Sequence, residues 1–194
     1  MNTDGQLAFR PPERDAAVQH QVHVRWDVKT GADTDAGRID STLITPSTIE
    51  SLSAQQALIP TPPSTRVSPV ETTIWELDAT LVGYKLEQDG DYHLVLADAN
   101  NNTMIAEIPD PAAVDPSSLF LSEITNARQT FDARFGQQMQ ALKALVQPGA
   151  AAPMIVQIAV PVHVTGIGFF DFIHGQTGVA PNGVELHPVL SISL

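Results

Sequence analysis

The chain lacks cysteine altogether, although it is 194 residues long. A sequence without thiols forms no disulfide, has no thiolate nucleophile and offers no cysteine ligand to zinc or to an iron–sulfur cluster. The absence leaves the redox compartment open, because such a chain suits any of them.

Basic residues are few: ten Lys and Arg stand against 22 Asp and Glu, which gives a formal net charge of −12. The imbalance is concentrated in residues 71–194, where four basic residues accompany fourteen acidic ones. Proteins hold a phosphate backbone through Lys and Arg that displace its counterions. We therefore expect no nucleic acid partner, and cationic or neutral partners are favoured. Solubility is the simpler explanation of the charge.

Long apolar runs are also missing, since no stretch approaches the ~20 residues that cross a bilayer. This predicts no membrane insertion. The first residues are polar and include two acids before residue 14, which is not the layout of a secretion signal. A cleaved signal stays open at this point. An apolar content of 43% is enough for a buried core.

The composition changes near residue 70, which predicts two parts. Residues 1–70 are rich in Thr, Ser, Asp, Ala and Pro and are interpreted as a partly disordered N-terminal arm. Within the arm, alternation predicts a short strand over Val22–Val28, and the capping-box pattern at Ser47–Glu50 predicts a short helix to about Leu58. Residues 71–194 are predicted to form the main domain.

Alternating apolar residues predict five strands in the main domain, over 73–87, 92–97, 103–108, 155–170 and 184–194. The apolar parity of the first strand shifts beside Gly83, which is typical of a β-bulge. Pro161 indicates a sheet edge or a bulge in the fourth strand, because proline cannot donate a ladder hydrogen bond.

One long helix is predicted between the third and fourth strands. Asp115 is the expected N-cap, with Pro116 at the first helical position. Phe120, Ile124, Ala127, Phe131 and Phe135 then form one apolar stripe. Gly136 is expected to end or kink this helix before a further helical piece that carries Met139, Leu142 and Leu145.

The element order is β-β-β-α-β-β, and its first strand is bent. This predicts a mainly β fold with one long helix, as an OB-fold-like five-stranded barrel. Staphylococcal-type nucleases have the same order. Nuclease activity is not expected here, because no Arg stands near the turn at Ile108–Pro111 that echoes the acidic turn of those enzymes.

Polar side chains gather around the last loop and the final strand. Glu185 and His187 share one face of that strand, while Asp171 and His174 lie in the loop before it. Two imidazoles with one or two carboxylates can bind a divalent metal, so these four residues are the candidate metal ligands. Their spacing matches no established metal motif.

Two other interpretations of this cluster stay open. The favoured one is a buried polar network, and the other is acid–base catalysis, for which no catalytic residue is assigned. His93 and Glu107 lie on neighbouring strands and could join the cluster. Together with the loop amides Gln176 and Asn182, they are predicted to bind a ligand.

Several segments resemble a group of uncharacterised bacterial proteins, over roughly residues 69–194. The resemblance is carried by Pro69–Thr73, Asp89–Leu96, Thr103–Pro109, Phe169–Gln176 and Glu185–Val189. It implies no activity and no cofactor. Because many such proteins look exported, it slightly favours an extracytoplasmic location.

The sequence therefore predicts a non-enzymatic OB-like binding module that contacts a protein or a small ligand around the 171–187 loop. The alternative is a metal-dependent hydrolase that uses Asp171, His174, Glu185 and His187. A third hypothesis is an extracellular assembly subunit whose arm, residues 1–70, reaches a neighbour.

Overall fold

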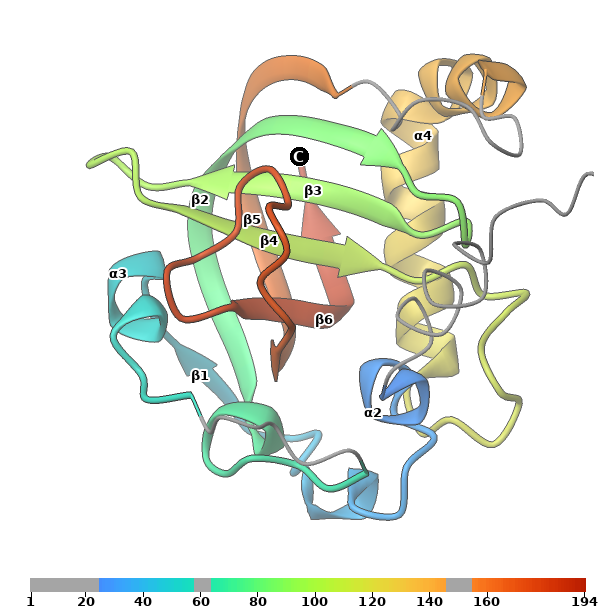
Figure 1. Cartoon of the computed structure of the whole chain (residues 1–194). Helices are drawn as coiled ribbons and strands as arrows, with labels where there is room; N and C mark the ends of the chain where they lie inside the picture. The colour runs from blue at the N-terminus through green and yellow to red at the C-terminus, as the bar shows by residue number, and fades with distance from the viewer. Residues whose placement is uncertain (1–24, 58–63, 146–154) are drawn as a thin grey trace, which may run out of the picture.

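The computed structural model describes residues 25–57, 64–145 and 155–194 (Figure 1). Its strands are β1 Ile44–Pro46, β2 Ile74–Leu86, β3 Tyr92–Ala97, β4 Thr103–Ile108, β5 Val156–Phe170 and β6 Val184–Ser193. Its helices are α2 Trp26–Thr30, α3 Ile49–Ser53 and α4 Leu121–Leu145, with short 3-10 turns at Ala36–Arg38 and Val70–Thr72. The fold is therefore mainly β with one long helix, as the sequence predicts. None of the described helices is long and apolar enough to cross a membrane.

The strands form one six-stranded sheet in the order β1-β2-β3-β4-β6-β5. β2, β3 and β4 are joined as an antiparallel meander, and β6 lies between β4 and β5, parallel to β4 and antiparallel to β5. β2 also pairs with β5 along most of its length. The sheet thus brings β3, β4 and β6 side by side, and these three strands carry the polar cluster.

The bend in β2 lies where the apolar parity shifts. The register changes between Leu81 and Gly83 in the pairings with both β3 and β5, which confirms the bulge. Pro161 pairs with Thr80 of β2, while the pairing of β5 with β6 begins only at His163. The edge that Pro161 indicates is therefore confirmed.

The start of α4 differs from the prediction. The helix begins at Leu121, and the predicted N-cap Asp115 instead accepts hydrogen bonds from the backbone N–H (2.8 Å) and the hydroxyl (2.6 Å) of Ser117 in a preceding turn. Asp closes such local turns as readily as it caps helices, so the local pattern does not separate the two. Gly136 does not end the helix. Figure 1 shows the last turns of α4 at an angle to the earlier ones, as the kink alternative expects.

The apolar stripe of α4 packs on the sheet. Phe131 is fully buried, and its ring centroid lies 5.4 Å from that of Tyr84 on β2 and 5.3 Å from that of Tyr92 on β3. Such offset and edge contacts between aromatic rings stabilise a core beyond their buried area. Ile49 and Leu52 of α3 belong to the same core. The division of the chain at residue 70 stays a prediction.

An arginine does lie near the turn after β4, contrary to expectation. Arg128 of α4 donates to the carbonyl oxygens of Ile108 (3.0 Å) and Gly90 (2.8 Å), and its guanidinium stacks 3.2 Å from the centroid of the Tyr92 ring. The sequence does not indicate this contact, because Arg128 is far along the chain from both Gly90 and Ile108. These backbone and ring contacts assign the guanidinium a structural role.

The predicted strand over Val22–Val28 is wrong where the structure describes it. Residues 26–30 form α2, which ends at Gly31 with a left-handed φ of 73°. Alternation over a few residues also fits a short helix whose buried positions are Val28 and Thr30. Residues 22–24 lie outside the described residues.

The predicted helix after Ser47 is present but shorter. α3 spans Ile49–Ser53, and its N-cap is Thr48, which accepts a hydrogen bond from the backbone N–H of Ser51 (3.0 Å). The capping pattern thus places the helix start correctly to within one residue, while the predicted end near Leu58 is too late.

Candidate metal and ligand site

Glu107 on β4 lies at the centre of a cluster of imidazoles and carboxylates. One of its oxygens lies 3.0 Å from Nδ1 of His93, and the other lies 3.1 Å from Nδ1 of His187. The sheet register explains this convergence, because His93 on β3 pairs directly with Glu107, while β6 runs parallel to β4 on its other side. One carboxylate therefore links three strands.

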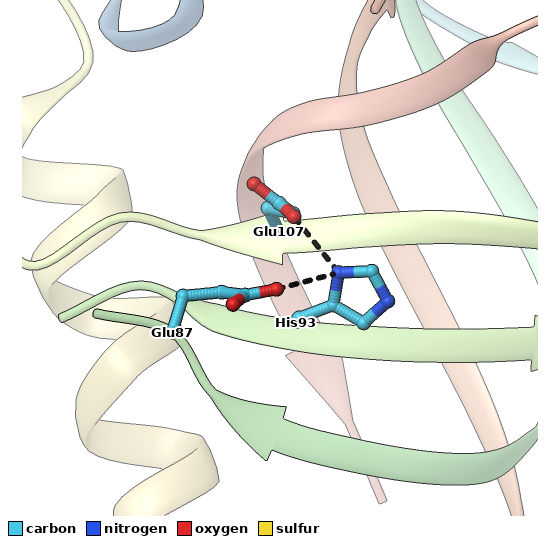
Figure 2. A group of neighbouring side chains, drawn as sticks. All are labelled: Glu87, His93 and Glu107. Carbon is cyan, nitrogen blue, oxygen red and sulfur yellow. Dashed lines mark hydrogen bonds and ion pairs between the residues drawn. The ribbon is translucent and has the colours of Figure 1, made fainter. Parts of the chain in front are cut away.

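The orientation of His93 is fixed from both sides. Its Nε2 lies 3.0 Å from the carbonyl oxygen of Thr177, which can only accept, so Nε2 carries a hydrogen, and in the charged ring Nδ1 donates the second hydrogen to Glu107. Figure 2 shows Glu87 and Glu107 both directed at one nitrogen of the ring. This is Nδ1, which lies 3.5 Å from the oxygen of Glu87 and 3.0 Å from that of Glu107. Lys85 lies 2.6 Å from the same oxygen of Glu87 and neutralises much of its charge. His93 thus joins the 171–183 loop to the sheet.

His187 and Asp91 complete the deeper part of the cluster. Nδ1 of His187 also lies 3.1 Å from an oxygen of Glu185, whereas its Nε2 faces Oδ2 of Asp91 at 3.7 Å. The other oxygen of Asp91 accepts from the backbone N–H of Asp110 (2.8 Å). Nε2 of His187 and Oδ2 of Asp91 are both buried, and neither has a hydrogen-bond partner among the described residues. Buried polar atoms of this kind are uncommon in native proteins.

Burial and mutual repulsion set the protonation of the carboxyl groups. Burial, with the neighbouring Asp89, raises the pKa of Asp91 to about 7. Burial, with Asp171 and Glu107, raises the pKa of Glu185 to about 7. For Glu107, burial would raise the pKa, but hydrogen bonds with His187 and His93 outweigh it and hold the pKa well below the usual range. Glu107 is therefore the carboxylate that stays ionised.

The pKa values of the two imidazoles are also raised, but here the cause is contact with carboxylates, and burial acts against it. Burial would lower the pKa of His187, but its contacts with Glu107 and Glu185 prevail and raise the pKa to about 9. Burial likewise opposes the charged form of His93, and the hydrogen bond with Glu107 outweighs it, so its pKa is raised. The cluster holds protons near neutral pH that isolated groups would not.

Two basic side chains from the N-terminal part of the described chain, Lys29 and Arg25, form ion pairs with buried or partly buried acids. Lys29 of α2 lies 3.2 Å from Asp171, and its pKa is raised because Glu185, Asp171 and Glu107 together outweigh the cost of burying its ammonium. Arg25 makes two hydrogen bonds of 2.7 Å to the buried carboxylate of Glu71. The structure therefore places Lys29, which the sequence reasoning assigned to the arm, beside the acidic cluster, while Arg25 neutralises the separate buried carboxylate of Glu71.

The structure distributes the four predicted metal ligands over three places. Glu185 and His187 are in contact within the cluster, and Asp171 pairs with Lys29 at its edge. His174 lies exposed on the loop, where its ring stacks on that of Phe172 with centroids 6.4 Å apart. These four side chains do not form one group of potential ligands within 4.8 Å in the part of the chain that the structure describes.

The predicted ligand-binding residues also separate. His93 and Glu107 are in the cluster, as described. Gln176 accepts from the backbone N–H of His174 and donates to the carbonyl oxygen of Phe172, both at 2.8 Å, and so folds the loop on itself. Asn182 donates to the carbonyl oxygens of Leu52 and Gln55 (2.9 Å each) and pins the loop to α3. Whether any of the four binds a ligand stays a prediction.

Sequence reasoning missed Glu87, the last residue of the first predicted strand, and Asp91, which directly precedes the second. The groups whose donor atoms lie within 4.8 Å of one another are Glu87–His93–Glu107 and Asp91–Glu107–His187. A signal for Asp91 was present, because it stands two residues before His93, the spacing that puts side chains on one face of a strand.

Comparison with known proteins adds no relative: no family model, no curated protein and no solved structure matches the chain. The site must therefore be interpreted from its own geometry.

Proposed function

We propose that this chain is an OB-fold-like β-barrel that serves as a non-enzymatic binding module, with the loop between β5 and β6 as its contact surface. The pairings of β2 with both β3 and β5, and of β6 with both β4 and β5, are those of an OB-type barrel with its helix between the third and fourth strands. In that architecture, the loop between the last two strands borders the ligand face.

The observation that carries the proposal is a pair of exposed apolar side chains on this loop. Phe172 is 68% exposed and Ile173 is 48% exposed. Exposed neighbours of this size on one loop are typical of contact surfaces, where aromatic side chains supply most of the binding energy. The stacking of His174 on Phe172 holds the ring in place. Below them, Gly178 packs against Val95 of β3, so that the loop rests on the sheet.

The partner that fits this surface is a protein segment with apolar or aromatic residues and positive or no net charge. The chain carries a net charge of −12, so an acidic segment would be repelled. The hydrolase alternative is not favoured by the burial of the cluster, because the side chains of Asp91 and His187 are each only 1% exposed and a substrate would have to reach them.

A selection from a random peptide library displayed on phage tests this proposal. We expect the full chain to select peptides that combine aromatic or aliphatic residues with Lys or Arg. Binding of the synthetic peptides, measured by fluorescence anisotropy, should weaken at least about thirtyfold for Phe172→Ser, which corresponds to a hot spot of about 2 kcal/mol.

The control is Leu119→Ser, since Leu119 is 60% exposed but lies outside the loop. Its affinity should be unchanged. Selection of acidic peptides, or binding that is insensitive to Phe172→Ser, would refute the proposed surface.

A further inference from the structure

Two buried atoms of the cluster face each other as an ion pair, and neither has a hydrogen-bond partner among the described residues. Oδ2 of Asp91 and Nε2 of His187 lie 3.7 Å apart, and both side chains are 1% exposed. A hydrogen bond between nitrogen and oxygen spans about 2.7–3.2 Å, so this separation is too long for one. Something other than a direct hydrogen bond must stabilise the two atoms.

The position of the ring hydrogen in neutral His187 determines what its Nε2 offers to Asp91. Its Nδ1 lies 3.1 Å from carboxylate oxygens of both Glu107 and Glu185, which can accept a hydrogen but cannot donate one when ionised. A neutral ring therefore keeps its hydrogen on Nδ1, and the lone pair on Nε2 points at the Asp91 carboxylate. Two acceptors that face each other in a buried place need a cation between them, which is the proton of the charged ring when no metal is bound and the metal ion when it replaces that proton.

We propose that Asp91, Glu107 and His187 bind a divalent transition-metal cation of the zinc or manganese class. The three residues each offer one donor atom, and these atoms lie within 4.8 Å of one another. Two donors that share one such ion at about 2.1 Å lie roughly 3.0–3.6 Å apart, close to the separation of the Asp91 and His187 atoms. One imidazole and two carboxylates are an accepted donor set for these ions.

Neighbouring groups already orient the three ligands. Glu185 accepts from Nδ1 of His187 in the manner of the carboxylate that orients a metal-bound histidine. His93 contacts the second oxygen of Glu107, and the backbone N–H of Asp110 donates to the second oxygen of Asp91. Each ligand thus has an outer partner that holds it in place.

The other group, Glu87–His93–Glu107, fits a cation less well. The ammonium of Lys85 lies 2.6 Å from Glu87 and occupies the side from which an ion would be held. Lys29, whose charge acts on Glu107 and His187, pairs instead with Asp171. The proposed ion would join β4, β6 and the residue that directly precedes β3, so its role is structural, and it is independent of the peptide surface on the loop.

Isothermal titration of the full chain with zinc or manganese chloride, after removal of metal with a chelator, tests the inference. We expect one equivalent to bind and the Tm to rise by roughly 5–10 °C at a hundredfold excess over Kd. Asp91→Asn should weaken binding by at least about tenfold, and Glu185→Gln by about ten- to a hundredfold through loss of the orienting carboxylate.

Two controls locate the ion. His174→Ala removes an exposed imidazole outside the group and should leave the affinity unchanged, as should Glu87→Gln. If Glu87→Gln abolishes binding while Asp91→Asn does not, the ion belongs to the other group and the proposal is wrong. Absence of binding at millimolar metal would also overturn it.

A measurement on the unmodified chain covers the case in which a variant fails to fold. Added manganese should broaden the imidazole NMR signals of His187 and His93 before those of His163 and His174. Broadening that begins at His163 or His174 would show surface binding only and would overturn the proposal.

Discussion

Glu107 shows how a single carboxylate can hold a charged cluster together. Two imidazoles contact its two oxygens, and their hydrogen bonds outweigh the burial that would otherwise raise its pKa. Its neighbours have less of this support, because Glu185 contacts one imidazole and Asp91 only faces one at 3.7 Å, and burial raises the pKa of each to about 7. Position relative to the imidazoles, more than burial itself, therefore decides which acid stays ionised.

His163 provides a pH-dependent ion pair outside the cluster. Its Nδ1 lies 2.9 Å from Asp78 and its Nε2 lies 3.0 Å from Glu76, so both nitrogens face carboxylates of β2. The hydrogen bond with Asp78, more than that with Glu76, raises its pKa above the ordinary value. The stabilisation is thus complete below about pH 6.5 and is lost as the pH rises through the folded-state pKa.

We expect His163→Gln to lower the free energy of unfolding by at most about 1 kcal/mol at pH 5.5, because the pair is exposed, and to have no effect near pH 9. Urea denaturation at the two pH values measures this difference. A destabilisation that grows with pH would contradict the assignment.

At the scale of elements, the loop between β5 and β6 is fixed by glycines at two different kinds of position. Gly178 and Gly175 both have a left-handed φ, of 86° and 91°. A Cβ at Gly178 would lie 2.5 Å from a methyl carbon of Val95 on β3, whereas a Cβ at Gly175 would meet nothing within 4 Å. Alanine substitution at Gly175 therefore tests backbone strain alone, whereas substitution at Gly178 tests strain and packing together.

Gly175→Ala should cost about 1–2 kcal/mol of stability, which is the penalty of a left-handed alanine. Gly178→Ala should cost roughly 1–3 kcal/mol more, because the loop must also move off the sheet. Thermal or urea denaturation of the two variants gives the comparison. Equal losses would mean that the loop does not rest on Val95.

On the scale of the whole molecule, the N-terminal segment and the sheet are joined by buried ion pairs. Glu71 is fully buried and accepts hydrogen bonds from Arg25 and from the backbone N–H groups of Val67 (2.6 Å) and Phe170 (2.9 Å). β1 adds a parallel strand beside β2. These contacts couple residues 25–57 to the sheet.

We expect the described parts to unfold in one transition, with coincident curves from circular dichroism and from the fluorescence of Trp26 and Trp75. Glu71→Gln should lower the free energy of unfolding by about 3–5 kcal/mol, since it leaves a buried guanidinium without its partner. Arg38→Gln is the control, because the Arg38 side chain is 54% exposed in its pair with Asp35 and should matter by less than about 1 kcal/mol. Two separate transitions would instead favour an independent arm.

The sequence by itself determined five of the six strands, all but β1, together with the presence of the long helix and the bulge. Alternating residues placed β3 and β4 at their observed bounds, and the shift beside Gly83 located the bend. These features depend on local periodicity, which a chain carries along its length. The sequence also indicated that His93 and Glu107 are cross-strand neighbours, because a short hairpin fixes their register.

Only the tertiary structure decided which side chains form the cluster. Asp91 and Glu107 meet His187 because β6 lies beside β4, a parallel pairing between strands far apart in the sequence. His174 was a reasonable candidate by residue type, yet the loop leaves it exposed. Local patterns record the face of a strand but not its distant neighbours, and the position of a long-range cluster depends on those neighbours.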